Sequence, residues 1–212
     1  MLSSGAKTLS LDAISIPSAN EERPAGLIVM LHTWGANAQT MAALVPQLSL
    51  PNYRFLLPNA PLSHPNVWGG RMWYDLETEN YQGLEESQQQ LTEWLNSLES
   101  STGIPPSSTI LAGFSQGGAM ALDIGFNLPI AGIISMSGYL HRAPEDIEPP
   151  SPSVLIVHGK RDQVVPLSAA QRMRDYLITV GAPVQYKELD IGYEITPEVL
   201  EVVRDFILVN IY

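Results

Sequence analysis

Residues 109–122 read TILAGFSQGGAMAL, in which an apolar run meets a run of small residues through the pattern Gly-Phe-Ser-Gln-Gly. The run from Thr109 to Ala112 is typical of a strand buried on both faces, and the segment from Gly118 to Asn127 is expected to be helical. A Gly-x-Ser-x-Gly turn between a strand and a helix is the signature of a nucleophile elbow. Ser115 is therefore the candidate nucleophile, and N-capping of the helix is its structural alternative.

The same alternation continues along the whole chain, where short apolar runs are separated by longer segments of helical period. It predicts an α/β fold with a mainly parallel sheet and helices on both of its faces. We expect one domain over residues 1–212, with strands at 8–16, 27–31, 53–57, 109–112, 132–135, 154–157 and 184–188. We expect helices at 41–48, 84–98, 118–127, 168–180 and 197–209.

Composition excludes several classes of function. Lys and Arg number 11 against 22 Asp and Glu, a net charge of −11 that repels phosphate backbones, so we expect no nucleic-acid partner. The chain has no cysteine, which removes disulfides, thiolate nucleophiles, iron–sulfur clusters and cysteine zinc sites. Its four histidines are scattered and form no His-Glu-x-x-His motif, so we expect no metal and no cofactor.

Hydropathy also limits where the protein works. The longest apolar runs are strand-sized and far below the ~20 residues that span a bilayer, so we expect no membrane span. Residues 1–10 lack the basic and apolar regions of a secretory signal, which favours a cytoplasmic location. The sequence leaves open whether the protein forms a homodimer. The strand at 184–188 and the helix at 84–98 are the two candidate interfaces.

A second motif follows the apolar run at 27–31, where the chain continues His-Thr-Trp-Gly. In α/β hydrolases a backbone N–H of this loop and the N–H of the residue after the nucleophile form the oxyanion hole. These two donors are Trp34 and Gln116. His32 is expected to brace the loop rather than act as a base.

A third motif, VLIVHGKRDQVVP at residues 154–166, puts polar residues at the end of another apolar run. An acid after a late strand fits the chain order Ser, Asp, His, and Asp162 is the candidate. The alternative is a surface carboxylate paired with Arg161. His158 is expected to be a buried, hydrogen-bonded residue.

Together these motifs resemble the phospholipase/carboxylesterase family of α/β hydrolases, which includes the acyl-protein thioesterases and small bacterial carboxylesterases. The resemblance implies an α/β-hydrolase fold with a minimal core and no large lid. It also implies a serine hydrolase acting on small-molecule esters or thioesters with modest acyl chains. It covers nearly the whole chain, through His32, residues 58–61, 71–75, 113–118 and 137–140, His158, Gly159, Asp162, Val165 and Pro166.

The sequence departs from that family at two positions. The family places its catalytic histidine in a Gly-His-Glu motif before the final helix, where this chain has Tyr193. A phenol is almost entirely protonated at pH 7 and is a poor base there. Thr33 stands where the family usually has glycine. His64 and His141, expected near the carboxyl edge of the sheet, are the alternative bases.

Two hypotheses follow. In the first, Ser115 is the nucleophile of a carboxylesterase-type hydrolase, Asp162 is the acid and Tyr193 occupies the base position. In the second, the protein is an inactive relative that binds an acyl ligand or a protein partner. Three large side chains are candidates for the wall of an acyl pocket: Trp68, Met72 and Trp73. The alternative is that they belong to the core, and we favour the core for Trp73.

Overall fold

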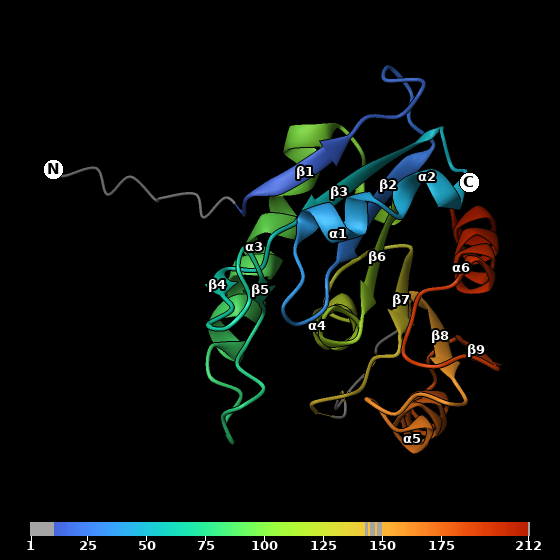
Figure 1. Cartoon of the computed structure of the whole chain (residues 1–212). Coiled ribbons are helices and arrows are strands. Elements are labelled where there is room, and N and C mark those ends of the chain that lie inside the picture. The colour runs from blue at the N-terminus through green and yellow to red at the C-terminus, as the bar shows by residue number, and fades with distance from the viewer. Residues whose placement is uncertain (1–10, 143, 145–146, 148–149, 212) are drawn as a thin grey trace, which may run out of the picture.

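The computed structural model describes residues 11–142, 144, 147 and 150–211. At its centre lies a seven-stranded sheet of order β1-β3-β2-β6-β7-β8-β9 (Figure 1). Every neighbouring pair is parallel except β1 and β3, which confirms the predicted mainly parallel sheet. The strands are β1 (Ala13–Ile16), β2 (Gly26–Leu31), β3 (Tyr53–Pro58), β6 (Thr109–Phe114), β7 (Gly132–Met136), β8 (Ser153–Gly159) and β9 (Val184–Leu189). Residues 8–10 of the first predicted strand lie outside the described residues.

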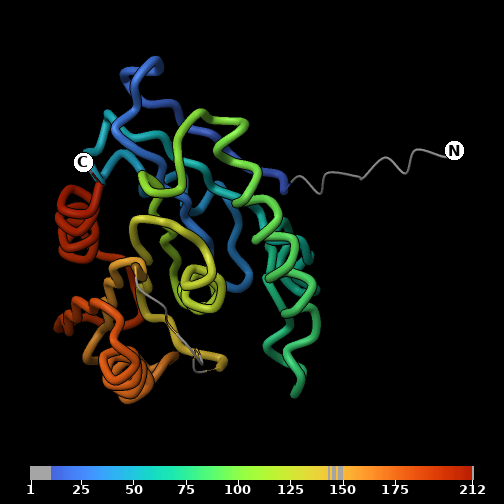
Figure 2. The backbone as a smooth tube through the Cα atoms, turned by 180° about the vertical axis from the view of Figure 1, so that it is seen from behind, coloured from blue at the N-terminus to red at the C-terminus, as the bar shows by residue number. Residues whose placement is uncertain are grey.

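Helices cover both faces of the sheet, as predicted. The side chains of β2 alternate between two apolar clusters, with Val29 and Leu31 in one and Ile28 and Met30 in the other. The first cluster holds α3 (Leu84–Thr102), α4 (Gln116–Gly125) and α5 (Leu167–Thr179). The second holds α1 (Ala38–Ala42), α2 (Val45–Leu48) and α6 (Pro197–Asn210). In Figure 2, α4 lies between α3 and α5.

The prediction was wrong for one helix. Residues 41–48 were expected to form a single helix, but the chain forms α1 and α2 with a break at residues 43–44. Pro46 lies in the first turn of α2, where its missing N–H costs nothing, and this position starts a new helix rather than continuing the old one. Three short elements were not predicted: β4 (Leu62–Ser63), β5 (Arg71–Met72) and the 3-10 helix Pro106–Ser108.

The parallel strands bring the candidate residues to one edge of the sheet, where β2, β6, β7 and β8 all end. The loops that begin at His32, Ser115, Ser137 and Lys160 therefore share that edge. Among the described helices, none has the length and apolar character that crossing a membrane requires.

Candidate active site

Ser115 sits in a strained turn. Its φ of 52° and ψ of −113° place a non-glycine residue in a rare backbone conformation that costs on the order of 1–3 kcal/mol. The turn is tight, because a Cβ on Gly113 would lie 2.1 Å from the carbonyl oxygen of Gly117. A Cβ on Gly117 would lie 2.4 Å from the carbonyl oxygen of Leu31. The Ser115 side chain makes no capping hydrogen bond, so the geometry is that of a nucleophile elbow.

Two backbone N–H groups are free to form an oxyanion hole. Gln116 opens α4, where an N–H has no partner inside the helix. In the loop after β2, the N–H groups of Gly35 and Ala36 donate to carbonyl oxygens at 2.9 and 3.1 Å, whereas that of Trp34 has no partner among the described residues. Both predicted donors are therefore without a hydrogen-bond partner among the described residues.

His32 holds the oxyanion loop from inside. Its Nδ1 donates to the carbonyl oxygen of Thr33 at 2.8 Å, and its Nε2 accepts the N–H of Ala60 at 3.0 Å. Burial lowers the pKa of His32 to about 4, so the ring is neutral at pH 7. Both nitrogens are occupied, which agrees with the expected bracing role.

Asp162 is a buried carboxylate with one free oxygen. Its Oδ1 accepts the N–H groups of Val164 and Val165, both at 2.9 Å. Its Oδ2 has no hydrogen-bond partner in the part of the chain that the structure describes, and His158 Nε2 lies 3.5 Å away. Arg161 instead pairs with Asp190, so the surface alternative fails. A free buried oxygen here is what a triad histidine would engage.

The two sequence departures contact one another. Tyr193 and Thr33, 160 positions apart, share a hydrogen bond of 3.0 Å between Tyr193 OH and Thr33 Oγ1. The Tyr193 ring packs on Phe114, beside the nucleophile, with ring centroids 4.7 Å apart. Tyr193 thus lies between the elbow and the oxyanion loop, and its hydroxyl ties down the loop.

Known proteins resemble this chain in sequence and in fold. The model of the family described as Phospholipase/Carboxylesterase matches residues 13–211. The chain belongs to the phospholipase/carboxylesterase family. This is a family of α/β hydrolases that act on esters and thioesters, which confirms the resemblance seen in the sequence.

Relatives within the family are named as enzymes. Acyl-protein thioesterase 1 of Neurospora crassa is 29% identical over 214 residues, which cover 87% of this chain and 86% of the relative. Acyl-protein thioesterase 1 homolog 1 of Dictyostelium discoideum is 30% identical and covers 73% and 75% of the two chains. The crystal structure of esterase PE8 superposes with a TM-score of 0.85 and 31% identity, over 95% of this chain and 100% of that one.

Neither alternative base shares a hydrogen bond with Ser115 among the described residues. His64 Nδ1 accepts the N–H of Asn66 at 3.1 Å, so the neutral ring carries its proton on Nε2 and has no lone pair left for Ser115. His141 uses both nitrogens, on Asp123 Oδ2 and Tyr74 OH, each at 2.6 Å. His141 was expected near this edge, whereas Asp123, a single carboxylate in the apolar helix α4, was not predicted.

The pocket candidates have different environments. Trp73 is fully buried in the core, as we favoured, and its backbone N–H donates to Gln116 Oε1 at 2.9 Å. Met72 is 9% exposed. Trp68 is fully exposed, so it remains a candidate only for contact with substrate at the surface.

Among the described residues, no group of three or more His, Asp or Glu side chains is arranged to hold a metal ion.

Proposed function

We propose that this family member is a serine hydrolase that cleaves carboxylic esters or thioesters through an acyl-enzyme on Ser115. The observation that carries the proposal is the backbone strain at Ser115, which the fold maintains although the side chain makes no capping hydrogen bond. Strain of this kind persists where it aims a side chain at a substrate, because a relaxed turn would be more stable.

The chemistry follows from the groups around Ser115. Its hydroxyl attacks the acyl carbon, and the oxygen that gains negative charge is held by the N–H groups of Trp34 and Gln116. The amino end of α4 adds the favourable end of a helix dipole. Water then releases the acid from Ser115 in a second step through the same oxyanion hole.

The position of Asp162 and Tyr193 predicts slower catalysis than in a complete triad. Asp162 keeps the free oxygen for a histidine, while Tyr193 donates or accepts its hydrogen bond at Thr33. In another serine hydrolase, loss of the histidine alone costs about 10⁶ in kcat, with a residual ~10³–10⁴ over water from the oxyanion hole and binding. A base at another position would recover part of that loss.

The alternative hypothesis of an inactive relative is not favoured, because the named relatives are enzymes and the elbow is intact. We also propose that the protein acts in the cytoplasm on small-molecule substrates and needs no cofactor. A homodimer through β9 or α3 remains an expectation.

Hydrolysis of p-nitrophenyl butyrate and of a butyryl thioester tests the proposal, with Ser115→Ala run beside the parent. We expect the parent to exceed Ser115→Ala by at least tenfold on one of the two substrates. Equal rates on both, between pH 6 and pH 10, would show that Ser115 is not a nucleophile. That result would favour the hypothesis that the protein is an inactive relative.

A further inference from the structure

A cavity of about 1030 Å³ lies between α3 and α4. Its wall is formed by residues 79–86, by the last turn of α4 and by residues 140–142 of the loop after β7. We call it the α3–α4 cavity. Pockets that bind small molecules have volumes of up to about 1000 Å³, so its size is sufficient for one. Its described lining contains none of the candidate catalytic residues: Ser115, Trp34, Gln116, Asp162 and Tyr193.

The lining of the α3–α4 cavity holds more acidic than basic side chains. The basic ones are Arg142 and His141. The acidic ones are Glu79, Glu85, Glu86 and Asp123. Even with a charge on His141, the carboxylates outnumber the bases. The whole chain carries a net charge of −11, which adds to the local attraction for positive ions. The α3–α4 cavity therefore favours a cation over an anion.

The helix ends at the α3–α4 cavity also favour a cation. The carboxyl end of α4 lines the cavity, and its last turn has no basic side chain to offset the partial negative charge there. The amino end of α3 lines it as well, but its first turn holds Glu85 and Glu86, which offset the partial positive charge. Neither helix therefore leaves an unbalanced positive charge in the cavity.

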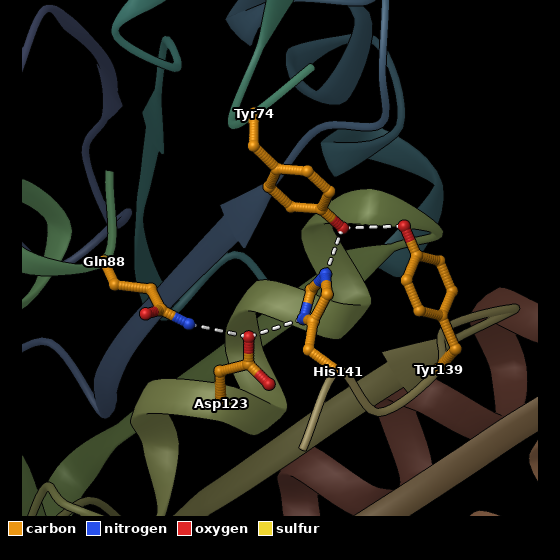
Figure 3. Close-up of polar contacts among 5 residues, drawn as sticks. All are labelled: Tyr74, Gln88, Asp123, Tyr139 and His141. Atoms are coloured by element: carbon orange, nitrogen blue, oxygen red, sulfur yellow. Dashed lines mark hydrogen bonds and ion pairs between the residues drawn. The ribbon is translucent and has the colours of Figure 1, made fainter. Parts of the chain in front are cut away.

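Asp123 is the buried carboxylate of the α3–α4 cavity (Figure 3). Its side chain is 7% exposed. Its Oδ2 accepts from Gln88 Nε2 at 2.8 Å and from His141 Nδ1 at 2.6 Å. Its Oδ1 has no hydrogen-bond partner among the described residues, although Asp123 lines the cavity. Because so little water reaches this side chain, a donor from a ligand would supply a charge-assisted hydrogen bond that Oδ1 otherwise lacks.

The surrounding side chains hold Asp123 in a fixed orientation. His141 Nε2 lies 2.6 Å from Tyr74 OH, which in turn lies 2.6 Å from Tyr139 OH (Figure 3). The rings of Tyr74 and Tyr81 pack edge-on against the imidazole, with centroids 4.8 and 5.3 Å away. A carboxylate held in this way loses little conformational entropy when a ligand binds to its second oxygen.

A single available oxygen selects an ammonium group among the cations. A guanidinium binds a carboxylate best through two parallel hydrogen bonds, and Asp123 Oδ2 already accepts two others. A metal ion needs several ligands, and no group of three or more His, Asp or Glu side chains in the described part of the chain could hold one. An ammonium is a compact charge that can use one oxygen here and direct its other N–H groups to water.

Apolar side chains line the same cavity, so the ammonium fits best on an aliphatic chain. The lining includes Tyr81, which is 38% exposed and presents a ring that can contact a cation or its methylene groups. The other large apolar lining residues are Leu84, Leu122, Phe126 and Leu140. An amine with a short aliphatic chain therefore matches both the charge and the surface of the cavity.

We propose that the α3–α4 cavity binds an aliphatic amine whose ammonium donates to Asp123 Oδ1 and whose methylene groups contact the apolar lining. The chemistry that the site recognises is a primary ammonium on an aliphatic chain, which free diamines and lysine side chains both present. The proposal goes beyond the proposed function and stands whether or not Ser115 is a nucleophile.

Isothermal titration calorimetry of the full chain with 1,4-diaminobutane tests the site. We expect one molecule to bind per chain with a Kd below about 1 mM at low salt, where screening is weakest. 1,4-Butanediol has the same length without the charge and should bind at least about tenfold more weakly. Nα-acetyl-lysine amide represents the second source. Binding within about threefold of the diamine would assign the site to lysine side chains, and weaker binding would assign it to free amines.

Variants locate the binding. Asp123→Asn keeps the shape of the side chain and should weaken binding of the diamine by about tenfold or more. The double variant Glu85→Gln, Glu86→Gln changes only exposed side chains and should weaken it by about threefold or more, which keeps the test open if Asp123→Asn does not fold. Glu93→Gln is the matched control, because Glu93 lies on α3 outside the cavity lining, and its affinity should stay within about twofold of the parent.

Three results would overturn the proposal. They are absence of saturable binding to the parent up to about 10 mM diamine, equal binding of the diol, and unchanged affinity in folded Asp123→Asn or in the double variant. None of them affects the proposed function, which fails only if the parent hydrolyses its substrates no faster than Ser115→Ala.

Discussion

His32 predicts a specific loss of stability in mild acid. The folded protein holds the ring neutral, with the pKa lowered to about 4, whereas in the unfolded chain it takes the ordinary value of 6.5. Below pH 6.5 the unfolded state therefore binds a proton that the folded state does not, and stability falls with pH until the folded pKa is reached. At pH 5 the difference spans about 1.5 pH units, or about 2 kcal/mol.

Thermal unfolding of the parent and of His32→Gln at pH 7 and pH 5 measures this effect. For a chain of this size 2 kcal/mol corresponds to a fall in Tm of about 4–8 °C. His32→Gln should be less stable at pH 7, because it loses one of the two hydrogen bonds of the ring, but its Tm should fall by that much less on acidification. Every other titrating group contributes equally to both proteins and cancels.

The bonds of the His32 ring explain why the folded protein keeps it neutral. Protonation of Nε2 would end its bond to the Ala60 N–H and leave a charge in the core. If Tm falls equally in both proteins between pH 7 and pH 5, within about 1 °C, the burial of a neutral imidazole at this position is not coupled to folding. The argument for His32 as a brace would then be refuted.

Three further predictions concern the elbow and the two departures. Gly117→Ala puts a Cβ 2.4 Å from a carbonyl oxygen of β2, so it should abolish fluorophosphonate labelling and lower Tm by several degrees. Gly192→Ala is the control, because its Cβ would have no atom nearer than 3.9 Å, and it should change Tm little. Tyr193→Phe removes the bond to Thr33 and should cost about 0.5–1.5 kcal/mol in urea unfolding, and a cost near zero would show that the bond is absent. Asp162→Asn should reduce the kcat of a Tyr193→His variant by about 10⁴-fold, as in other triads, because that variant has a histidine for the carboxylate to orient. In the parent the loss should be less than tenfold, because Asp162 Oδ2 has no hydrogen-bond partner among the described residues. Equal losses in the two proteins would contradict this account of Asp162.

Much of the fold was predictable because its signals are local. Buried strands read as apolar runs and the elbow requires glycine at fixed spacing, so the strands and Ser115 follow from short stretches of sequence. Parallel strands end at one edge, which is enough to place Trp34, Gln116 and Asp162 at the same edge of the sheet. The break at residues 43–44 was missed because the apolar period continues across it, and the two-residue strands β4 and β5 are too short to have a period.

Contacts between distant side chains were not predictable. Nothing in the sequence pairs Thr33 with Tyr193, although both stood out as departures. The dyad of Asp123 and His141 joins a helix to a loop 18 positions away and has no motif. The one signal was Asp123 itself, a carboxylate among Ala, Met, Leu and Ile in α4, where an unpaired charge would be costly.

Covalent labelling of Ser115 by a fluorophosphonate tests the central claim most directly. The probe reacts with a serine that an oxyanion hole and a base activate, and peptide mass spectrometry identifies the modified residue. We predict labelling on the peptide containing Ser115, abolished in Ser115→Ala and faster in Tyr193→His than in the parent. Absence of label on Ser115 in the parent at every pH from 6 to 10 would contradict the claim that this elbow carries a nucleophile.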